Sequence, residues 1–360
     1  MNKIFILSPL PPPVHGMSLA SKILIDELKS SKEWDCHFFD TSNSPNIESS
    51  KKQGKFNLFK IISSLRNFSI CLFKMILFRP NIVYIAIPQS FLGFVSYLPY
   101  LILSKLILSR VILHFHGANY TSLFSSKVIG FLLIKIVKMT VDNIIVLGYS
   151  LKKGLLLYFD DDFISVCENG VNNRLVERRK YNKVGKINLL YFSNLMISKG
   201  VLVFLDALIE HKDICDKFNI TICGGFDDNC DEILERLNKV DSFVNYRGPL
   251  YGLDKSQEFE NADVFILPSY NEGQPLSILE AYMHGCCVIS TIVGGIGDIF
   301  VDKVNGYEIK VGSVESIYDC LINLNKNDLA AFGAYNEILA NDIFTEKAFS
   351  NRVIEIFNKV

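Results

Sequence analysis

The chain has 360 residues, of which 49% are hydrophobic, and its formal net charge is −1. This length suits two domains of about 170 residues each, and the apolar content is sufficient for two cores. The first apolar run, residues 4–7, reaches Pro9 too soon to be the core of a signal peptide, so we expect a strand there. The nine cysteines are odd in number and show no CxxC spacing. They favour reduced thiols in a cytosolic protein over a disulfide framework or a zinc site.

The small net charge conceals an asymmetry along the chain. Between Glu48 and Asp142 there is no Asp or Glu, whereas twelve Lys or Arg residues occur there. A basic and apolar segment predicts an anionic surface as its partner. Long aliphatic runs such as residues 71–78 favour the inner face of a membrane over nucleic acid. The alternative is that these runs are core helices whose lysines extend to water.

The first half of the chain alternates short apolar runs with longer amphipathic stretches. Strands are expected at residues 3–8, 35–39, 81–87, 110–115, 142–146 and 163–167, and helices at 17–30, 56–78, 91–108, 122–139 and 149–158. The most apolar window, 91–108, contains a proline and a lysine, so we interpret it as a crossover helix and not as a membrane span. Such alternation predicts a mostly parallel sheet with helices on both faces. Residues 1–168 are therefore assigned to an N-terminal Rossmann-like domain.

Two loops of this half have residues that suit a ligand. The proline-rich loop after the first strand ends at His15-Gly16, and a glycine there lets the backbone approach a ligand at a helix N-terminus. His114 and His116 come at the end of the strand 110–115. In an unbroken strand they would share a face, but the chain is expected to turn at Gly117, so both need not enter one site. A zinc site would need two further ligands nearby, and the sequence offers none.

Residues 169–186 are polar and rich in turn-forming residues, and we expect them to be a linker. The alternation then resumes, with strands expected at 187–192, 218–223, 243–247, 263–268 and 287–291, and helices at 200–212, 229–240, 254–261, 276–285 and 314–325. Residues 187–343 are therefore predicted to form a second Rossmann-like domain. A last helix is expected at 344–358.

A cation marks the first loop of the second domain. Lys199-Gly200 lies where the loop after the strand 187–192 meets the next helix. A lysine there faces the unfavourable, positive end of the helix dipole, which is reasonable if a phosphate binds beside it.

The clearest chemical pattern follows the strand 263–268. It reads Asn271-Glu272-Gly273-Gln274-Pro275-Leu276-Ser277-Ile278-Leu279-Glu280-Ala281. Ligands of open α/β sheets bind outside the carboxyl ends of the strands, where helix N-termini offer unpaired N–H groups. Glu272 in the loop and Glu280 about two turns into the helix can thus contact two parts of one extended ligand. Solvated carboxylates are the alternative, but Glu280 lies between apolar residues and should have a partner.

The segment 268–281 resembles the E-x7-E signature of the family 4 glycosyltransferases, a group of retaining enzymes with the two-domain GT-B fold. The resemblance is loose over the whole chain and close over residues 187–310. It implies two doubly wound Rossmann-like domains that face each other across a cleft. The N-terminal domain would bind the acceptor and the C-terminal domain a nucleotide-diphosphate sugar. The helix at 344–360 would cross back to the N-terminal domain.

The resemblance also implies roles for individual residues. Glu272 would hold sugar hydroxyls and stabilise positive charge at the anomeric carbon, and Glu280 would hold the ribose. Lys199 would steady the leaving phosphate, and His116 would contact the transferred sugar. The remaining donor contacts would come from Gly16, Asn194, Gly273, Gln274, Pro275, Leu276, Ser277 and, near the nucleotide base, Arg247.

The chain departs from the family pattern at Ser193-Asn194, where the family has glycine and an arginine that helps to grip the diphosphate. Asn194 can donate a hydrogen bond but carries no charge, so leaving-group stabilisation would rest more on Lys199 and backbone N–H groups. No metal or other cofactor is expected. The DxD pattern at residues 160–162 is interpreted as a solvated turn, and Lys199 with helix N-termini can neutralise a diphosphate.

The sequence thus predicts a retaining glycosyltransferase that moves a sugar from a nucleotide-diphosphate sugar to a saccharide acceptor, expected to be lipid-linked, in the synthesis of a bacterial surface polysaccharide such as O-antigen, capsule or exopolysaccharide. It is expected in the cytoplasm, at the inner face of the plasma membrane, with no nucleic-acid partner. Two alternatives stay open: a nucleotide-sugar 2-epimerase of the same fold, and a non-catalytic partner subunit, which Asn194 suggests. A dehydrogenase is not supported, because no GxGxxG follows the first strand.

Overall fold

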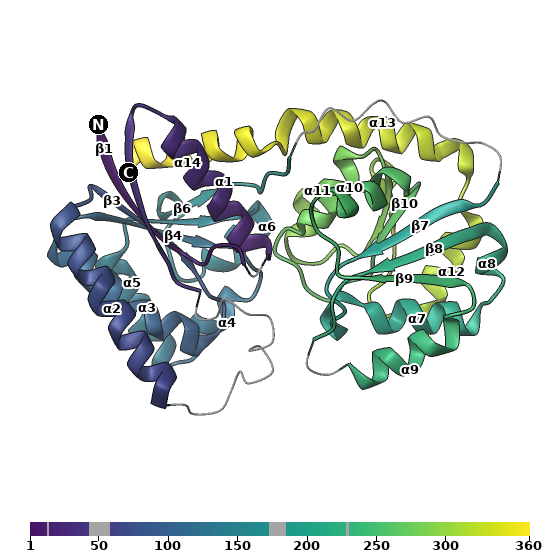
Figure 1. The fold of residues 1–360 in the computed structure, drawn as a ribbon, viewed down its shortest axis with the longest axis horizontal. Helices are drawn as coiled ribbons and strands as arrows, with labels where there is room; N and C mark the ends of the chain where they lie inside the picture. Colours follow the sequence, from purple (N-terminus) through teal and green to yellow (C-terminus); the bar gives the residue numbers. More distant parts are fainter. Residues whose placement is uncertain (13, 43–57, 173–184, 228–229) are drawn as a thin grey trace. The chain divides into compact units, whose positions relative to one another are not determined.

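A computed structural model describes residues 1–12, 14–42, 58–172, 185–227 and 230–360, with the backbone only for residues 58–65. The chain divides into two compact units (Figure 1): unit 1 is Met1–Asn169 with Glu346–Val360, and unit 2 is Gly170–Thr345. Most of the expected linker, residues 173–184, lies outside the described residues. Residues 170–172 belong to unit 2, where the Val171 N–H donates to the Phe344 carbonyl (2.8 Å).

Unit 1 has one parallel sheet of six strands in the order β2-β1-β3-β4-β5-β6. Its elements are β1 (Asn2–Ser8), α1 (Gly16–Ser30), β2 (Trp34–Asp40), α2 (Leu58–Phe78), β3 (Ile82–Ile87), α3 (Phe91–Leu106), β4 (Arg110–Phe115), α4 (Tyr120–Phe124), α5 (Ile129–Thr140), β5 (Asn143–Val146), α6 (Tyr149–Leu155), β6 (Ile164–Val166) and α14 (Glu346–Lys359). Strand order reverses between β1 and β3, so loops from both directions meet there.

Alternate residues of the central strands in unit 1 face two different helix layers. Ile4 and Ile6 of β1 pack with α1 and α14, whereas Phe5 and Leu7 pack with α2, α3 and α5. Successive side chains of a strand point to opposite faces, so a continuous apolar run is buried on both sides. The C-terminal helix α14 packs against α1 (Figure 1), and its Phe349 is fully buried. The last helix is therefore part of the unit built by the first half of the chain.

Unit 2 has a second parallel sheet of six strands, in the order β12-β11-β10-β7-β8-β9. Its elements are β7 (Ile187–Phe192), α7 (Val201–Glu210), α8 (Ile214–Lys217), β8 (Phe218–Cys223), α9 (Asp231–Val240), β9 (Val244–Gly248), α10 (Gly252–Asn261), β10 (Val264–Leu267), α11 (Leu276–Met283), β11 (Cys287–Ser290), β12 (Gly306–Glu308), α12 (Val314–Asn323) and α13 (Lys326–Ile343). From the central pair β7 and β10 the sheet extends in both directions. The carboxyl ends of β7 and β10 are therefore the switch point where such sheets bind ligands.

These two doubly wound units confirm the fold class predicted from the sequence. One expected helix, 122–139, is wrong, because the structure has α4 and α5 in its place. Gly130, in the first turn of α5, permits a close approach to α4, since a Cβ there would lie 2.3 Å from the Phe124 carbonyl oxygen. The second helix thus starts close against the end of the first. The window 91–108 forms α3, a crossover between β3 and β4 as predicted, and within the described ranges no helix combines the length and apolarity needed to span a bilayer.

The helix α13 is an element that the sequence analysis missed. Its buried residues are Leu329, Gly333, Asn336 and Ala340. They recur at helical spacing, but only one of them is a large apolar residue, so apolar periodicity gives no signal. Asn336 is fully buried and donates to the carbonyls of Cys286 and Asn305, at 2.8 Å each. Polar contacts to distant segments, and not an apolar face alone, hold this helix in place.

Candidate active site

The loops after β7 and β10 are fastened together at the switch point of unit 2. The Tyr270 N–H donates to the Ser198 carbonyl (2.9 Å). Gly200 has φ of +74°, and a Cβ there would lie 1.9 Å from the Pro268 carbonyl oxygen. Only glycine fits both this backbone conformation and this close approach. In the Lys-Gly pair, the glycine therefore allows the two loops to approach each other, and the lysine supplies the charge.

Lys199 and Glu272 form an ion pair where these loops meet. The Lys199 Nζ lies 2.7 Å from both carboxylate oxygens of Glu272, and the Ser269 Oγ donates to Glu272 Oε1 (2.8 Å). Glu272 is only 5% exposed, and a buried carboxylate is stable only with partners of this kind. The Lys199 side chain is 26% exposed, so an incoming anion can reach the ammonium.

Two further segments hold the Glu272 loop. Thr291, which follows β11, donates through Oγ1 to the Ser269 carbonyl (2.6 Å), and the Gly295 N–H donates to the Glu272 carbonyl (3.1 Å). The buried Tyr191 of β7 donates its hydroxyl to the Lys199 carbonyl (3.2 Å). Burial, with the nearby charge of Glu272, raises the pKa of Tyr191, so this hydroxyl stays a donor. The ion pair thus sits in a fixed frame.

The helix α11 begins directly after this loop. Pro275 is its N-cap and Leu276 its first residue, which agrees with the helix expected from residue 276. The side chain of Pro275 makes no capping hydrogen bond to this N-terminus. Its first-turn N–H groups and the positive end of the helix dipole suit an anion. Of the other residues predicted here, Gln274 is buried, and Gly273 and Ser277 are partly exposed.

Glu280 lies on α11 and pairs with Lys255 of α10. The Lys255 Nζ is 2.6 Å from Glu280 Oε2, and both side chains are 22% exposed. The prediction that Glu280 has a partner is thereby confirmed. The Lys255 ammonium also lies 5.3 Å from the ring centroid of Phe192, at the end of β7. The sequence analysis missed Lys255, because nothing in its local pattern distinguishes it from a solvated helix lysine.

The last two predicted residues of this unit are at the surface. Arg247, at the end of β9, is exposed and pairs with Glu258 of α10 (3.1 Å). Asn194, in the loop after β7, is exposed, and its carbonyl accepts from the Met196 N–H (2.8 Å). The three elements α11, α10 and β9 therefore carry a row of alternating charges: Glu280, Lys255, Glu258 and Arg247.

The other two predicted residues, Gly16 and His116, lie in unit 1. Gly16 is the exposed first residue of α1, capped by His15, whose Nδ1 accepts from the Ser18 N–H (3.3 Å). His116 follows β4, and its ring stacks on that of His114 (centroids 3.9 Å apart). The Tyr84 hydroxyl and His114 Nδ1 are hydrogen-bonded at 2.6 Å, so His114 has a partner within unit 1.

The imidazole of His116 is neutral and has free hydrogen-bonding capacity for an uncharged ligand group. Both ring nitrogens are buried, and neither has a hydrogen-bond partner among the residues that the structure covers. Burial, with the nearby His15, lowers the pKa of His116 to about 3. The ring is therefore neutral near pH 7, with one donor and one acceptor nitrogen.

The described ranges hold no cluster of three or more His, Cys, Asp or Glu residues placed to bind a metal ion. Residues 160–162, which contain the DxD pattern, form a surface turn. Asp161 there is exposed and pairs with Lys152 (2.9 Å). This geometry agrees with the interpretation of that segment as a solvated turn.

Comparison with known proteins supports a glycosyltransferase-like chain. Residues 186–327, which include Lys199, Arg247, Glu272 and Glu280, match the family described as Glycosyl transferases group 1. The N,N'-diacetylbacillosaminyl-diphospho-undecaprenol alpha-1,3-N-acetylgalactosaminyltransferase of Campylobacter jejuni is 25% identical over 185 residues, 48% of this chain and 48% of that protein. The UDP-Gal:alpha-D-GlcNAc-diphosphoundecaprenol alpha-1,3-galactosyltransferase of Escherichia coli is 27% identical over 187 residues, 47% of this chain and 46% of that protein.

The chain spans about half the length of these curated relatives. Among solved structures, sucrose-phosphate synthase from Thermosynechococcus elongatus matches with a TM-score of 0.78 at 14% identity, over 100% of this chain and 99% of its own. This likeness shows the fold, which is GT-B.

Proposed function

We propose that this protein is a retaining glycosyltransferase that moves a sugar from a nucleotide-diphosphate sugar to a lipid-linked saccharide in the assembly of a bacterial surface polysaccharide. The observation that carries this proposal is the Lys199–Glu272 ion pair at the switch point of unit 2, in the segment that matches the glycosyltransferase family. A buried carboxylate next to a reachable ammonium suits a substrate that separates into a cationic sugar and an anionic phosphate.

In the proposed reaction the diphosphate binds beside Lys199 and the N-terminus of α11. The ammonium gives up one of its two contacts with Glu272 and donates to the departing phosphate, whose charge grows as the sugar–phosphate bond breaks. Glu272 stabilises the positive charge at the anomeric carbon and stays held by Ser269. Retention requires the acceptor hydroxyl to bond to that carbon on the face that the phosphate leaves, and its proton can pass to the phosphate.

The nucleotide is proposed to bind along the row of charges from α11 to β9. Glu280 would hold the ribose hydroxyls while Lys255 keeps its carboxylate oriented, and Arg247 would lie near the base. The name of the E. coli relative includes UDP-Gal, so UDP-sugars are the first donors to test. His116, with its neutral and unpartnered ring nitrogens, is proposed to contact the transferred sugar.

We further propose that no metal takes part. In the loop after β7, Asn194 stands where the family pattern has a second cation. The phosphate charge would therefore be balanced by Lys199 and by the first-turn N–H groups of α11. Leaving-group stabilisation then depends strongly on one side chain.

A lipid-linked acceptor and contact with the inner face of the membrane are also proposed. The names of both curated relatives include diphospho-undecaprenol. The helix α5 has an exposed side with Phe131, Leu132 and Met139 next to Lys135 and Lys138. Apolar and basic side chains on one helix face suit an anionic bilayer surface.

The experiment is mass spectrometry of the purified protein incubated with UDP-, GDP- and ADP-sugars, scoring free nucleotide and free sugar. One donor is expected to be hydrolysed slowly. The rate should fall about 100-fold or more in Glu272→Gln, because a transition-state contact is lost. Glu308→Gln, an exposed carboxylate at the end of β12, is the matched control and should keep the wild-type rate. EDTA should leave the rate unchanged.

Other outcomes would favour the alternatives. An isomerised nucleotide sugar without released nucleotide would support a 2-epimerase. Silence with every donor, even after lipid-linked saccharides are added, would contradict catalysis and favour a non-catalytic partner subunit.

A further inference from the structure

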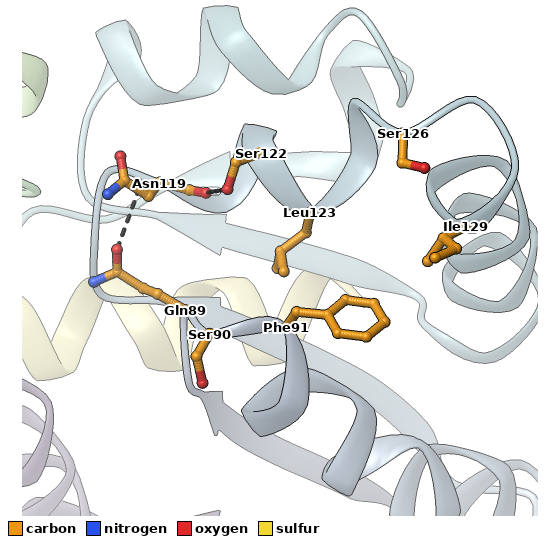
Figure 2. Close-up of a pocket in the computed structure, with 8 residues that line it drawn as sticks. All are labelled: Gln89, Ser90, Phe91, Asn119, Ser122, Leu123, Ser126 and Ile129. Carbon is orange, nitrogen blue, oxygen red and sulfur yellow. Dashed lines mark hydrogen bonds between the residues drawn. The ribbon is translucent and has the colours of Figure 1, made fainter. Parts of the chain in front are cut away.

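Unit 1 contains a pocket that is lined by none of the candidate active-site residues described above. It has a volume of about 560 Å³ and lies where the chain leaves β3 and β4 (Figure 2). The strands of parallel sheets place their ligand loops at this end. The size falls within the range of sites for small molecules, and a pocket of this kind with a few polar groups is a candidate binding site.

The lining of the pocket is uncharged and has two kinds of surface. One kind is amide and hydroxyl, from Gln89, Asn119, Ser122 and Ser126. The other is apolar, and Figure 2 shows Phe91, Leu123 and Ile129 directed toward one another. Among the described residues that line it, none is charged, so the pocket does not match a phosphate or a nucleotide. A sugar ring does match, because it presents hydroxyls at its edge and a C–H face that packs on an aromatic ring.

The polar wall is held in place before any ligand binds. Gln89 Oε1 accepts from the Asn119 N–H (3.2 Å), and the Ser122 Oγ donates to the Asn119 carbonyl (2.6 Å). The Gln89 amide also packs against Gly117, where a Cβ would lie 1.6 Å from its Nε2. Gly117 directly follows His116, so the polar wall adjoins the loop that carries that histidine.

The apolar wall continues onto exposed apolar side chains. Leu92, next to Phe91, is 78% exposed, and Val128, next to Ile129, is 79% exposed. Leu132, three residues after Ile129 on α5 and therefore on the same side of the helix, is 55% exposed. No acidic residue occurs between Glu48 and Asp142 in the sequence. The surroundings therefore suit a ligand whose sugar enters the pocket while its lipid chain lies outside.

We propose that this pocket binds the uncharged sugar of a lipid-linked acceptor. The proposal rests on the proposed function for its biological meaning, but the binding can be tested without any donor. The apolar wall takes one face of the sugar ring, the amides and hydroxyls take its edge, and the lipid chain leaves past Phe91 and Ile129.

The test is a saturation-transfer NMR titration of the full chain with octyl glucoside, octyl galactoside and octyl N-acetylglucosaminide below their micelle concentrations. Octyl tetraethylene glycol has the same chain and a neutral head without a sugar. At least one octyl glycoside should bind about tenfold more tightly than this comparison compound, because the polar wall recognises the sugar. Ser126→Trp, which fills the pocket from its exposed rim, should weaken that binding about tenfold or more. Ser125→Trp, one residue away and outside the lining, should leave it unchanged.

Phe91→Ala is a second variant with little risk to folding, because that side chain is 43% exposed, and it should also weaken binding. Equal binding of the glycosides and the glycol, or equal binding by wild type and Ser126→Trp, would overturn the proposal. The titration needs no donor, and the hydrolysis assay needs no octyl glycoside, so the two proposals fail separately. Hydrolysis of a donor without binding of any octyl glycoside would contradict the pocket proposal only. Binding of a glycoside without hydrolysis of any donor would contradict the proposed function only.

Discussion

At the scale of single residues, Gly200 links the folding of unit 2 to its proposed chemistry. Its φ of +74° and its contact with the Pro268 carbonyl bring Lys199 to Glu272. Gly200→Ala should lower the free energy of unfolding by about 3 kcal/mol, because it adds a steric clash to the roughly 1–2 kcal/mol cost of a left-handed alanine. Gly252→Ala is the matched control, since φ there is +58° and no atom of the described residues lies within 4 Å of the added Cβ. Urea denaturation followed by circular dichroism would compare the two, and equal losses would contradict the steric argument.

His116 gives unit 1 a predictable response to acid. Its pKa is about 3 in the folded protein and about 6.5 in an unfolded chain, so the unfolded state binds the extra proton between these values. Stability should therefore fall as the pH drops from 6.5 toward 3, and this effect should be absent above about pH 6.5. His116→Gln should reduce the slope by about 1.4 kcal/mol per pH unit between pH 6 and 4.

The measurement can be confined to unit 1. Trp34 is the only tryptophan of the sequence and is buried in that unit, so its fluorescence in urea follows the unfolding of unit 1. Parallel stability curves for the wild type and His116→Gln between pH 6 and 4 would contradict the assigned burial of the imidazole. His15 and His114 lie close to His116 and stay in both proteins, so the comparison isolates one group.

At the scale of elements, α5 is the helix that we expect to contact a membrane. Replacing Phe131 and Leu132 together by serine should weaken binding to phosphatidylglycerol vesicles at least tenfold, because burial of each side chain contributes about 1.5–3 kcal/mol. Ile338→Ser is the control, since Ile338 of α13 is 58% exposed and lies in unit 2. Vesicle cosedimentation at low and high salt would measure the effect, and salt should weaken the contribution of Lys135 and Lys138. If the wild type does not bind these vesicles at low salt, the membrane contact is wrong.

At the scale of the whole molecule, the residues proposed to bind the nucleotide and its diphosphate all lie in unit 2. Lys199, Glu272 and Glu280 all belong to Gly170–Thr345, whereas α14 belongs to unit 1. Residues 170–345 expressed alone should therefore fold and bind UDP within about threefold of the affinity of the full chain, without transferring sugar. Residues 170–325 are the control. They lack α13 and therefore Asn336, so the buried carbonyls of Cys286 and Asn305 lose this hydrogen-bond donor. These residues alone should fail to fold. Calorimetric titration with UDP would test both, and loss of UDP binding by residues 170–345 would show that unit 1 is needed.

The sequence by itself determined most of the strands and the alternation that makes two doubly wound sheets. These features depend on local apolar periodicity, which each segment carries within its own residues. It also predicted that Lys199 and Glu272 lie in loops at the carboxyl ends of strands, because the chain order of strand, loop and helix fixes this. Local pattern was insufficient where burial is not apolar, as in α13, and where an apolar stretch divides into two closely packed helices, as in α4 and α5.

Only the tertiary structure decided which of these groups meet. Lys199 and Glu272 are 73 residues apart and pair because β7 and β10 are neighbours, an order that no local pattern encodes. Lys255 reaches Glu280 from a neighbouring helix, and Gln89 reaches Gly117 from the next strand. Sequence periodicity reports how each element divides its residues between core and water. The partners of buried charges and the walls of a pocket depend on which elements become neighbours, and that is settled by packing across the whole domain.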